Sequence, residues 1–285
     1  MPSTEEIKKR LADSLDKIPS LPTTVGKVIQ LANDINSSAK DILAVIQLDP
    51  VLTAKVLKLI NSAFYGMPNK ISLPQAVVLL GINTIKNLAL SSAIVGQMGQ
   101  NTVKIKTFDQ DMFWKHSLGA GIAAKTICKK LKVDPKMMDE YFVAGLIHDL
   151  GKLVMALSMP MFMAKALQCA ESGKLNGAES EQKVIGIDHS EVGSMLAQKW
   201  SLNEALVNSI LYHHRPQEKE GQLTWVVHMA NYLVHKLGYP NTGDFGDPQI
   251  CNGAFAGLNL SEKELLDSLA NLPEEIEKAT VFLKT

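Results

Sequence analysis

An apolar helical stretch that ends in adjacent histidine and aspartate is the feature that most constrains how this chain can fold. Apolar residues recur at helical spacing over residues 142–150, and His148 and Asp149 fall near the end of the run. Burying an imidazole beside a carboxylate is unfavourable unless a third group satisfies both, and a divalent cation does so. An ordinary helix end, with Lys152 near the carbonyl end of the helix dipole, is the alternative interpretation.

The other histidines favour the interpretation as a site, because several fall where further apolar runs begin or end. The histidines at such places are His116, His189, His213 and His214. Neutral imidazole is the commonest metal ligand in proteins, so the pattern predicts that these rings converge on His148 and Asp149. For the remaining two, His228 and His235, we prefer a structural interpretation, in which the rings satisfy backbone groups.

The order of these residues resembles a known family. His116, then His148-Asp149-Leu150-Gly151-Lys152, then His189, then His213-His214 is similar to the HD superfamily of metal-dependent phosphohydrolases, closest in spacing to its HD-GYP and HDOD branches. Four earlier fragments resemble the N-terminal half of HDOD signalling domains. These fragments are residues 18–22, 48–52, 59–65 and 76–81. Together the two resemblances cover about residues 15 to 240.

The resemblance implies a divalent metal site. In HD proteins a histidine, the His-Asp pair and a later aspartate hold the metal, and His116, His148 and Asp149 match the first three. The later aspartate aligns with Asn231, whose neutral carbonyl oxygen lacks the charge that offsets a dication. We therefore expect an ion such as Fe, Mn, Zn or Ni, held at low occupancy.

A second metal is implied by the HD-GYP branch, where added histidines match His189 and one or both of His213 and His214. Two departures from that branch count against cyclic-dinucleotide hydrolysis. Met112 stands where the branch has a glutamate, and Arg215-Pro216 stands where its Gly-Tyr-Pro run begins.

For catalysis, the resemblance assigns roles to Asp149 and Lys152. A metal-bound water would attack a phosphoester, with Asp149 holding the metal and Lys152 neutralising the phosphate oxygens. A solvated charge at a helix end is the alternative for Lys152, and the residues alone leave both open.

The sequence predicts an all-α protein, with no persistent β-alternation and no internal repeat. The expected helices cover residues 4–16, 23–32, 38–47, 50–61, 75–80, 84–98, 114–131, 135–148, 153–167 with a break at Pro160, 179–184, 190–199, 203–213, 223–237 and most of 249–284. A polar stretch over residues 99–111 predicts two units, an N-terminal HDOD subdomain (1–105) and an HD-like domain with C-terminal helices (106–285).

The composition limits the classes of binding partner that we expect. Lys plus Arg and Asp plus Glu are both 29, so formal net charge is zero, and we expect neither nucleic acid nor an anionic membrane as partner. The N-terminus is charged, and no run reaches the roughly 18 apolar residues of a membrane span. The three cysteines are few and far apart, which is typical of reduced thiols in the cytoplasm.

Two functions remain open. One is an HDOD-type signal-transduction output module that keeps a metal site and binds a protein signalling partner or a phosphorylated small molecule. The other is an active metal-dependent phosphohydrolase acting on a nucleotide or another phosphoester. Asn231 and the HDOD-like first half favour the module, and the histidine set favours the enzyme. We favour the module.

Overall fold

The computed structural model describes residues 4–34, 36–99, 101–219 and 221–284, and no strand occurs among them. The predicted all-α class is therefore confirmed. The first unit consists of α1 (Thr4–Lys17), α2 (Thr23–Asn33), α3 (Ala39–Gln47), α4 (Pro50–Ile60), α5 (Leu73–Leu80) and α6 (Ile82–Met98).

Local capping explains where several of these helices begin. The Ser38 side chain accepts a hydrogen bond from the backbone N–H of Asp41 and starts α3 with a reciprocal capping box. Asp49 accepts from the N–H of Leu52, and Pro50 occupies the first turn of α4, as expected. Helix α2 begins at Thr23, directly after Pro22, and its N-terminus has no side-chain cap.

The second unit carries the histidines. Its elements are α7 (Gln110–Lys130), the 3-10 helix η1 (Pro135–Met137), α8 (Met138–Ile147), α9 (Leu150–Ser158), α10 (Pro160–Gly173), α11 (Gly177–Val184), α12 (His189–Lys199), α13 (Glu204–Leu211), the 3-10 helix η2 (Pro216–Glu218) and α14 (Gln222–Lys236). The chain ends in α15 (Ala254–Gly257), α16 (Glu262–Ser268), α17 (Leu272–Ala279) and the 3-10 helix η3 (Thr280–Lys284).

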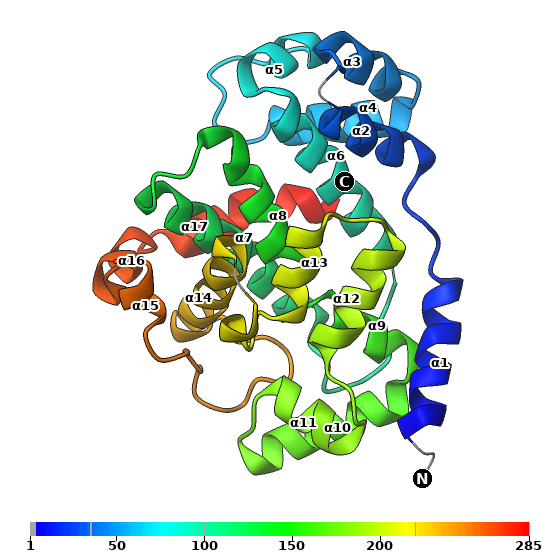
Figure 1. Ribbon diagram of the computed structural model, residues 1–285, viewed down its shortest axis with the longest axis vertical. Coiled ribbons are helices and arrows are strands. Elements are labelled where there is room, and N and C mark those ends of the chain that lie inside the picture. The colour runs from blue at the N-terminus through cyan, green and yellow to red at the C-terminus, as the bar shows by residue number, and fades with distance from the viewer. Residues whose placement is uncertain (1–3, 35, 100, 220, 285) are drawn as a thin grey trace.

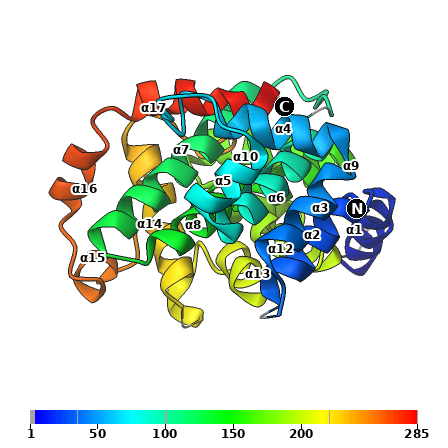
Figure 2. The same ribbon diagram turned by 90° about the horizontal axis from the view of Figure 1, so that it is seen from above.

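Helices α2–α6 gather at one end of the molecule, while α7, α8 and α14 lie at the centre of the second unit (Figure 1). Helix α1 lies away from α2–α6 (Figure 1) and packs on α9 and α12; seen from above, it lies at one side of the molecule (Figure 2). At the other terminus η3 packs against α4, α6 and α7. One hydrophobic core runs through both units, so the boundary at residue 105 stays a prediction.

Two glycines allow the site helices to approach closely. A Cβ on Gly145 would lie 2.6 Å from the backbone carbonyl of Ala120, so α8 can lie directly against α7. A Cβ on Gly151 would lie 1.9 Å from the carbonyl oxygen of His189, so α9 can lie against the start of α12. Both contacts bring histidine-bearing segments together.

In the methionine-rich segment around Pro160, Met155, Met159 and Met163 are buried, whereas Met161 is 75% exposed. In the described part of the chain, the stretch Pro135–Ser158 is long and apolar enough to cross a membrane, against our expectation, yet 89% of the 18-residue apolar window within it is buried inside the fold. The pair α5 and α6 passes the same test only if the 119° bend between them is ignored. Burial of this kind is typical of core helices.

Candidate metal centre

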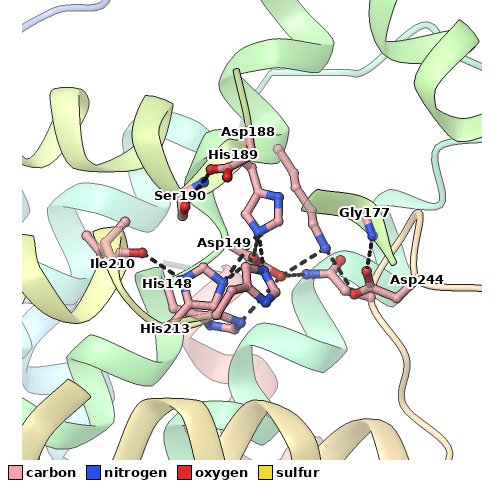
Figure 3. A network of polar contacts seen from close by, with 12 residues as sticks. His148, Asp149, Gly177, Asp188, His189, Ser190, Ile210, His213 and Asp244 are labelled. Atoms are coloured by element: carbon pink, nitrogen blue, oxygen red, sulfur yellow. Dashed lines mark hydrogen bonds and ion pairs between the residues drawn. The ribbon is translucent and has the colours of Figure 1, made fainter. Parts of the chain in front are cut away.

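Asp149 lies at the centre of the site, at the break between α8 and α9, and its side chain is 1% exposed. Histidine rings reach it from four places: α7, the C-terminus of α8, the N-terminus of α12 and the segment after α13. His148, His189 and His213 point toward Asp149 in Figure 3. Residues more than 90 positions apart in the chain therefore meet in one buried cluster, of which His116 and His214 are also members.

The first half of the cluster faces Oδ2 of Asp149. That oxygen lies 3.3 Å from Nε2 of His148 and 3.9 Å from Nε2 of His116. The two ring nitrogens are 3.4 Å apart. These three side chains form one group whose ligand atoms all lie within 4.8 Å of one another.

The second half faces Oδ1 of the same carboxylate. This oxygen lies 2.9 Å from Nε2 of His189 and 3.5 Å from Nε2 of His213. Nε2 of His214 lies 2.9 Å from Nε2 of His189. The structure thus brings together six of the seven predicted ligands, with Asp149 shared between two halves.

Four rings are held in one orientation by hydrogen bonds from Nδ1. The acceptors are the carbonyl oxygens of Tyr239 for His116, Gly145 for His148 and Ile210 for His213, and a carboxylate oxygen of Glu181 for His189, at 2.6–2.7 Å. None of these acceptors carries a proton, so each ring must donate from Nδ1. A neutral ring of this tautomer presents a lone pair at Nε2, and all four Nε2 atoms face Asp149.

This donor set fits a divalent cation. Lone pairs of neighbouring rings face each other at 3.4 Å in both halves, where only a proton or a cation can satisfy them. Among the described residues, Oδ1 of Asp149 is buried with no hydrogen-bond partner, although it lies close to His189. Nitrogen and oxygen ligands of this kind suit Zn, Fe, Mn or Ni.

The electrostatics of the cluster follow from burial and from the shared carboxylate. Burial and the neighbouring His148 lower the pKa of His116 to about 4, and burial lowers the pKa of His213 to about 4 as well. Burial also lowers the pKa of His189, but Glu181 and Asp149 outweigh it and raise that pKa to about 10. His148, Lys152 and His189 hold the pKa of Asp149 well below its usual range, in spite of its burial.

Lys152 is fully buried, so the interpretation as a solvated charge is wrong. Its Nζ lies 3.2 Å from Oδ2 of Asp149 and 3.0 Å from Oδ2 of Asp244. Burial lowers the pKa of Lys152, but Asp149, Asp244 and Glu181 together raise it above its ordinary value. Its predicted role at phosphate oxygens stays a prediction, and in this arrangement its charge is engaged by two carboxylates.

Asn231, the seventh predicted ligand, lies beside the cluster. It borders a small cavity together with His214 and Asp244, and among the described residues it makes no hydrogen bond to the cluster. The amide that does reach Asp149 belongs to Asn241, whose Nδ2 donates to Oδ2. Of the two histidines expected to be structural, His228 donates from Nδ1 to the carbonyl of His213 and accepts from the N–H of Cys251.

The sequence did not identify three residues of the site, which are Glu181, Asn241 and Asp244. Asn241 and Asp244 lie in a loop whose glycines, asparagines and aspartates are those of any turn. Glu181 lies on a short, otherwise charged helix and is nevertheless 1% exposed. The available signal was the spacing of Glu181 eight residues before His189, with Gly186 between them to turn the chain.

A cavity of about 680 Å³ opens beside the second half of the cluster. His214 lines it, and so do the cations Lys183 and Arg215. Arg215 is half-exposed, and its ion pairs with Asp188 and Glu218 are long, at 3.9 Å each. A small molecule in this cavity would lie next to the histidines and to two basic side chains.

The all-helical fold and the paired histidine groups around one aspartate define a protein of the HD superfamily. The sequence profile of the HDOD domain matches residues 18–216, which is more than half of the chain. The chain therefore belongs to the HDOD domain family.

Solved structures of similar proteins agree with this assignment. A Shewanella amazonensis SB2B protein, named as a putative phosphohydrolase, is 25% identical to this chain and has a TM-score of 0.74. The match covers 96% of this chain and 98% of the Shewanella chain. An HDOD domain protein of unknown function from Geobacter sulfurreducens is 24% identical with a TM-score of 0.76, with the same coverage, and shows the fold alone. An uncharacterized protein of Treponema pallidum (strain Nichols) is 27% identical over 239 residues, which are 82% of this chain but 45% of that protein. The chain thus spans less than half the length of this curated relative.

Proposed function

We propose that this chain is an HDOD-type signal-transduction output module whose buried cluster holds a divalent cation, beside which a phosphorylated ligand or a protein signalling partner binds. The observation that carries the proposal is the common orientation of His116, His148, His189 and His213, each donating from Nδ1 and presenting Nε2 to Asp149. Metal-ligating histidines almost always donate their other N–H to a carbonyl or carboxylate in this way.

The cavity beside the cluster supports a phosphorylated ligand. A bound cation would supply Lewis-acid polarisation of a phosphoryl oxygen. Arg215 and Lys183 line the same cavity and can hold further phosphate oxygens through charge-assisted hydrogen bonds. Because Lys152 is already paired with Asp149 and Asp244, phosphate recognition falls to these two cavity residues.

Other parts of the proposal concern location and partners. A cytoplasmic location is supported by Cys128, Cys169 and Cys251, which are all free thiols. Zero formal net charge gives no support to a nucleic-acid partner, so none is proposed, and no membrane partner is proposed.

The second candidate is an active metal-dependent phosphohydrolase. The observation in its favour is that the cavity of about 680 Å³ reaches His214 in the second half of the cluster, so that a phosphoester could lie within reach of a metal-bound water. The departures at Met112, Arg215-Pro216 and Asn231 weigh against efficient turnover.

The test compares binding with turnover in the metal-loaded protein. Inorganic phosphate is titrated calorimetrically, and hydrolysis of bis(p-nitrophenyl) phosphate is followed, in the unaltered chain and in Asp149→Asn. The module predicts phosphate binding that needs the metal, with hydrolysis within a few-fold of the variant. Brisk hydrolysis that Asp149→Asn abolishes would establish the enzyme instead, and phosphate binding that is indifferent to metal would contradict both.

A further inference from the structure

The two oxygens of Asp149 have different surroundings, and this difference decides where a cation enters. We propose that a divalent cation binds the half formed by His189, His213 and His214, while the ammonium of Lys152 takes the place of a second cation at Oδ2. One chain then holds one tightly bound ion. This inference rests on the metal-holding function proposed above.

Oδ2 of Asp149 already accepts from two donors. Nζ of Lys152 lies 3.2 Å away, and Nδ2 of Asn241 donates to the same oxygen. The orientation of the Asn241 amide is fixed, because its Oδ1 accepts from the N–H of Thr242 at 2.7 Å. A cation between His116 and His148 would have to displace these donors or share the oxygen with them.

Lys152 is built into its place by the surrounding fold. Its second partner, Asp244, accepts from the backbone N–H of Gly177 at 2.7 Å and so is held by the start of α11 (Figure 3). A Cβ on Gly177 would lie 3.2 Å from Cε of Lys152 and 3.1 Å from Oδ1 of Asp244, so a side chain at this position would crowd the pair. The fold therefore holds the ammonium of Lys152 in place between Asp149 and Asp244.

The loop that carries Asn241 and Asp244 is tied down at two further points. Oγ1 of Thr242 donates to the carbonyl of Asp109 at 2.7 Å, next to the start of α7. The carbonyl of Tyr239 accepts from Nδ1 of His116 at 2.7 Å. These contacts hold the backbone of the loop beside Asp149.

The other half offers a cation what the first half lacks. Oδ1 of Asp149 has no hydrogen-bond partner among the described residues. Three ring nitrogens surround it, and Glu181 stands behind His189, accepting from its Nδ1 at 2.6 Å and from its backbone N–H at 2.8 Å. A carboxylate behind a ligating histidine makes that ligand more basic. Three nitrogens and one anionic oxygen that has no ammonium beside it make a set typical of a four-coordinate site.

The charges beside the two halves also favour a cation in the second half. The first half contains one carboxylate oxygen that is already neutralised by Lys152, so a dication there would face an ammonium across Asp149. Lys152 is also paired with Asp244, so its charge is shared between two carboxylates. The second half has the carboxylate of Glu181 as well, next to Nδ1 of His189, and this additional negative charge favours a dication there.

The test uses a matched pair of variants, His116→Gln and His213→Gln. Both rings are fully buried, and both donate from Nδ1 to a main-chain carbonyl, so that the two substitutions disturb similar surroundings. The chain is stripped of metal and titrated with Zn²⁺ against a competing chelator that masks weak surface sites. We expect one ion per chain, an affinity lowered about 10-fold or more in His213→Gln, and little change in His116→Gln.

A second experiment removes the ammonium from Oδ2 without leaving Asp244 as an unpaired buried charge. In the double variant Lys152→Met with Asp244→Asn both partners become neutral, and we expect a second Zn²⁺ to bind. The control is Lys125→Met with Asp139→Asn, which neutralises another buried-carboxylate pair, 2.7 Å apart, away from the cluster. The control should keep one ion.

The outcomes separate this inference from the proposed function. Two ions of similar affinity in the unaltered chain, or a larger loss in His116→Gln than in His213→Gln, would overturn the inference and leave the metal-holding function intact. An unaltered chain that takes up no Zn²⁺ would overturn both. If the Lys152→Met double variant does not fold, the histidine pair alone decides the question.

Discussion

The helices α2–α6 and the helices α7–α14 share one hydrophobic core but bury different kinds of polar group. The first set buries only neutral polar side chains, which are Thr84, Asn87, Ser91 and Ser92. The second set buries charged and titratable side chains, among them His148, Asp149, Lys152, Glu181 and His189. Burial of a charge is unfavourable unless it is paired, so this concentration marks the second set as the functional part.

The two sets also differ in the apolar side chains that they expose to solvent. Leu48, Val51, Val78 and Leu79 of the first set are 63–82% exposed, whereas the second set hides nearly all of its site. The first set thus offers apolar contact surface without titratable groups, and the second offers a mostly buried cluster of titratable groups. The predictions below ask how sharply this division holds.

The largest effect is expected for Gly151→Ala in the second set. The new Cβ would meet the carbonyl oxygen of His189 at 1.9 Å, so α9 and α12 must separate. We expect a loss of about 3 kcal/mol or more in the free energy of unfolding. Urea denaturation measures this loss.

Gly26→Ala in α2 is the matched control for that prediction. Nothing lies within 4 Å of the Cβ that it would add, and the position is in an exposed helix interior. Alanine should therefore stabilise the protein by about 0.5–1 kcal/mol. If both variants lost the same free energy of unfolding, the close contact between α9 and α12 could not be the cause of the loss at Gly151.

Next comes Asp139→Asn, at the junction of the two sets. Asp139 accepts from Thr84 of α6 at 2.8 Å and from Lys125 of α7 at 2.7 Å. Because Lys125 is partly exposed, its water-screened charge limits the effect, and we expect a loss of about 1–2 kcal/mol.

Tyr65→Phe is the smaller companion change at the same carboxylate. The hydroxyl of Tyr65 donates to Asp139 over 3.4 Å, a long hydrogen bond, so its removal should destabilise the protein by less than about 1 kcal/mol. Thermal unfolding of the two variants compares them directly, and a larger effect for Tyr65→Phe would refute this ranking.

Asn231→Asp tests whether position 231 in the second set provides a direct metal ligand. The family resemblance predicts that a carboxylate here raises metal affinity, but Asn231 lies beside the cluster, on a cavity shared with His214 and Asp244. We therefore expect a gain in Zn²⁺ affinity of no more than about 10-fold, or about 1.4 kcal/mol. A gain of several hundred-fold in a chelator-competition titration would show that position 231 provides a direct ligand.

The smallest effect is expected for Val78→Ser on α5. This side chain is 82% exposed, so the free energy of unfolding should change by no more than about 0.5 kcal/mol. If the surface of α2–α6 binds a protein partner, the same change should weaken that complex. Salt-sensitive DNA binding by the chain would instead contradict our expectation that nucleic acid is not a partner.

Local signals in the sequence were sufficient to predict most of the helices. Ser38 and Asp49 each cap their helix through hydrogen bonds within three residues, which a sequence pattern contains completely. At α2 no such cap is present, because Pro22 precedes the first turn and Thr23 is already helical.

The site was only partly predictable, for a physical reason. His148 and His189 lie at helix ends, where polar residues interrupt apolar runs, so the sequence pattern alone could identify them. Asn241 and Asp244 reach the cluster because a loop folds back across α11 and α7, an arrangement set by contacts such as that of Asp244 with Gly177. No periodicity in the chain records a contact over 67 residues.

The most direct test of the central claim, that the buried cluster is a metal centre, is elemental analysis of the purified chain. The protein is incubated with Fe²⁺, Mn²⁺, Zn²⁺ or Ni²⁺, freed of unbound ion, and compared with Asp149→Asn after both are shown to be folded. We predict that the unaltered chain retains a divalent ion and that the variant, which loses the carboxylate shared by both halves, does not. Equal metal content in the two proteins, or none in either, would contradict the account.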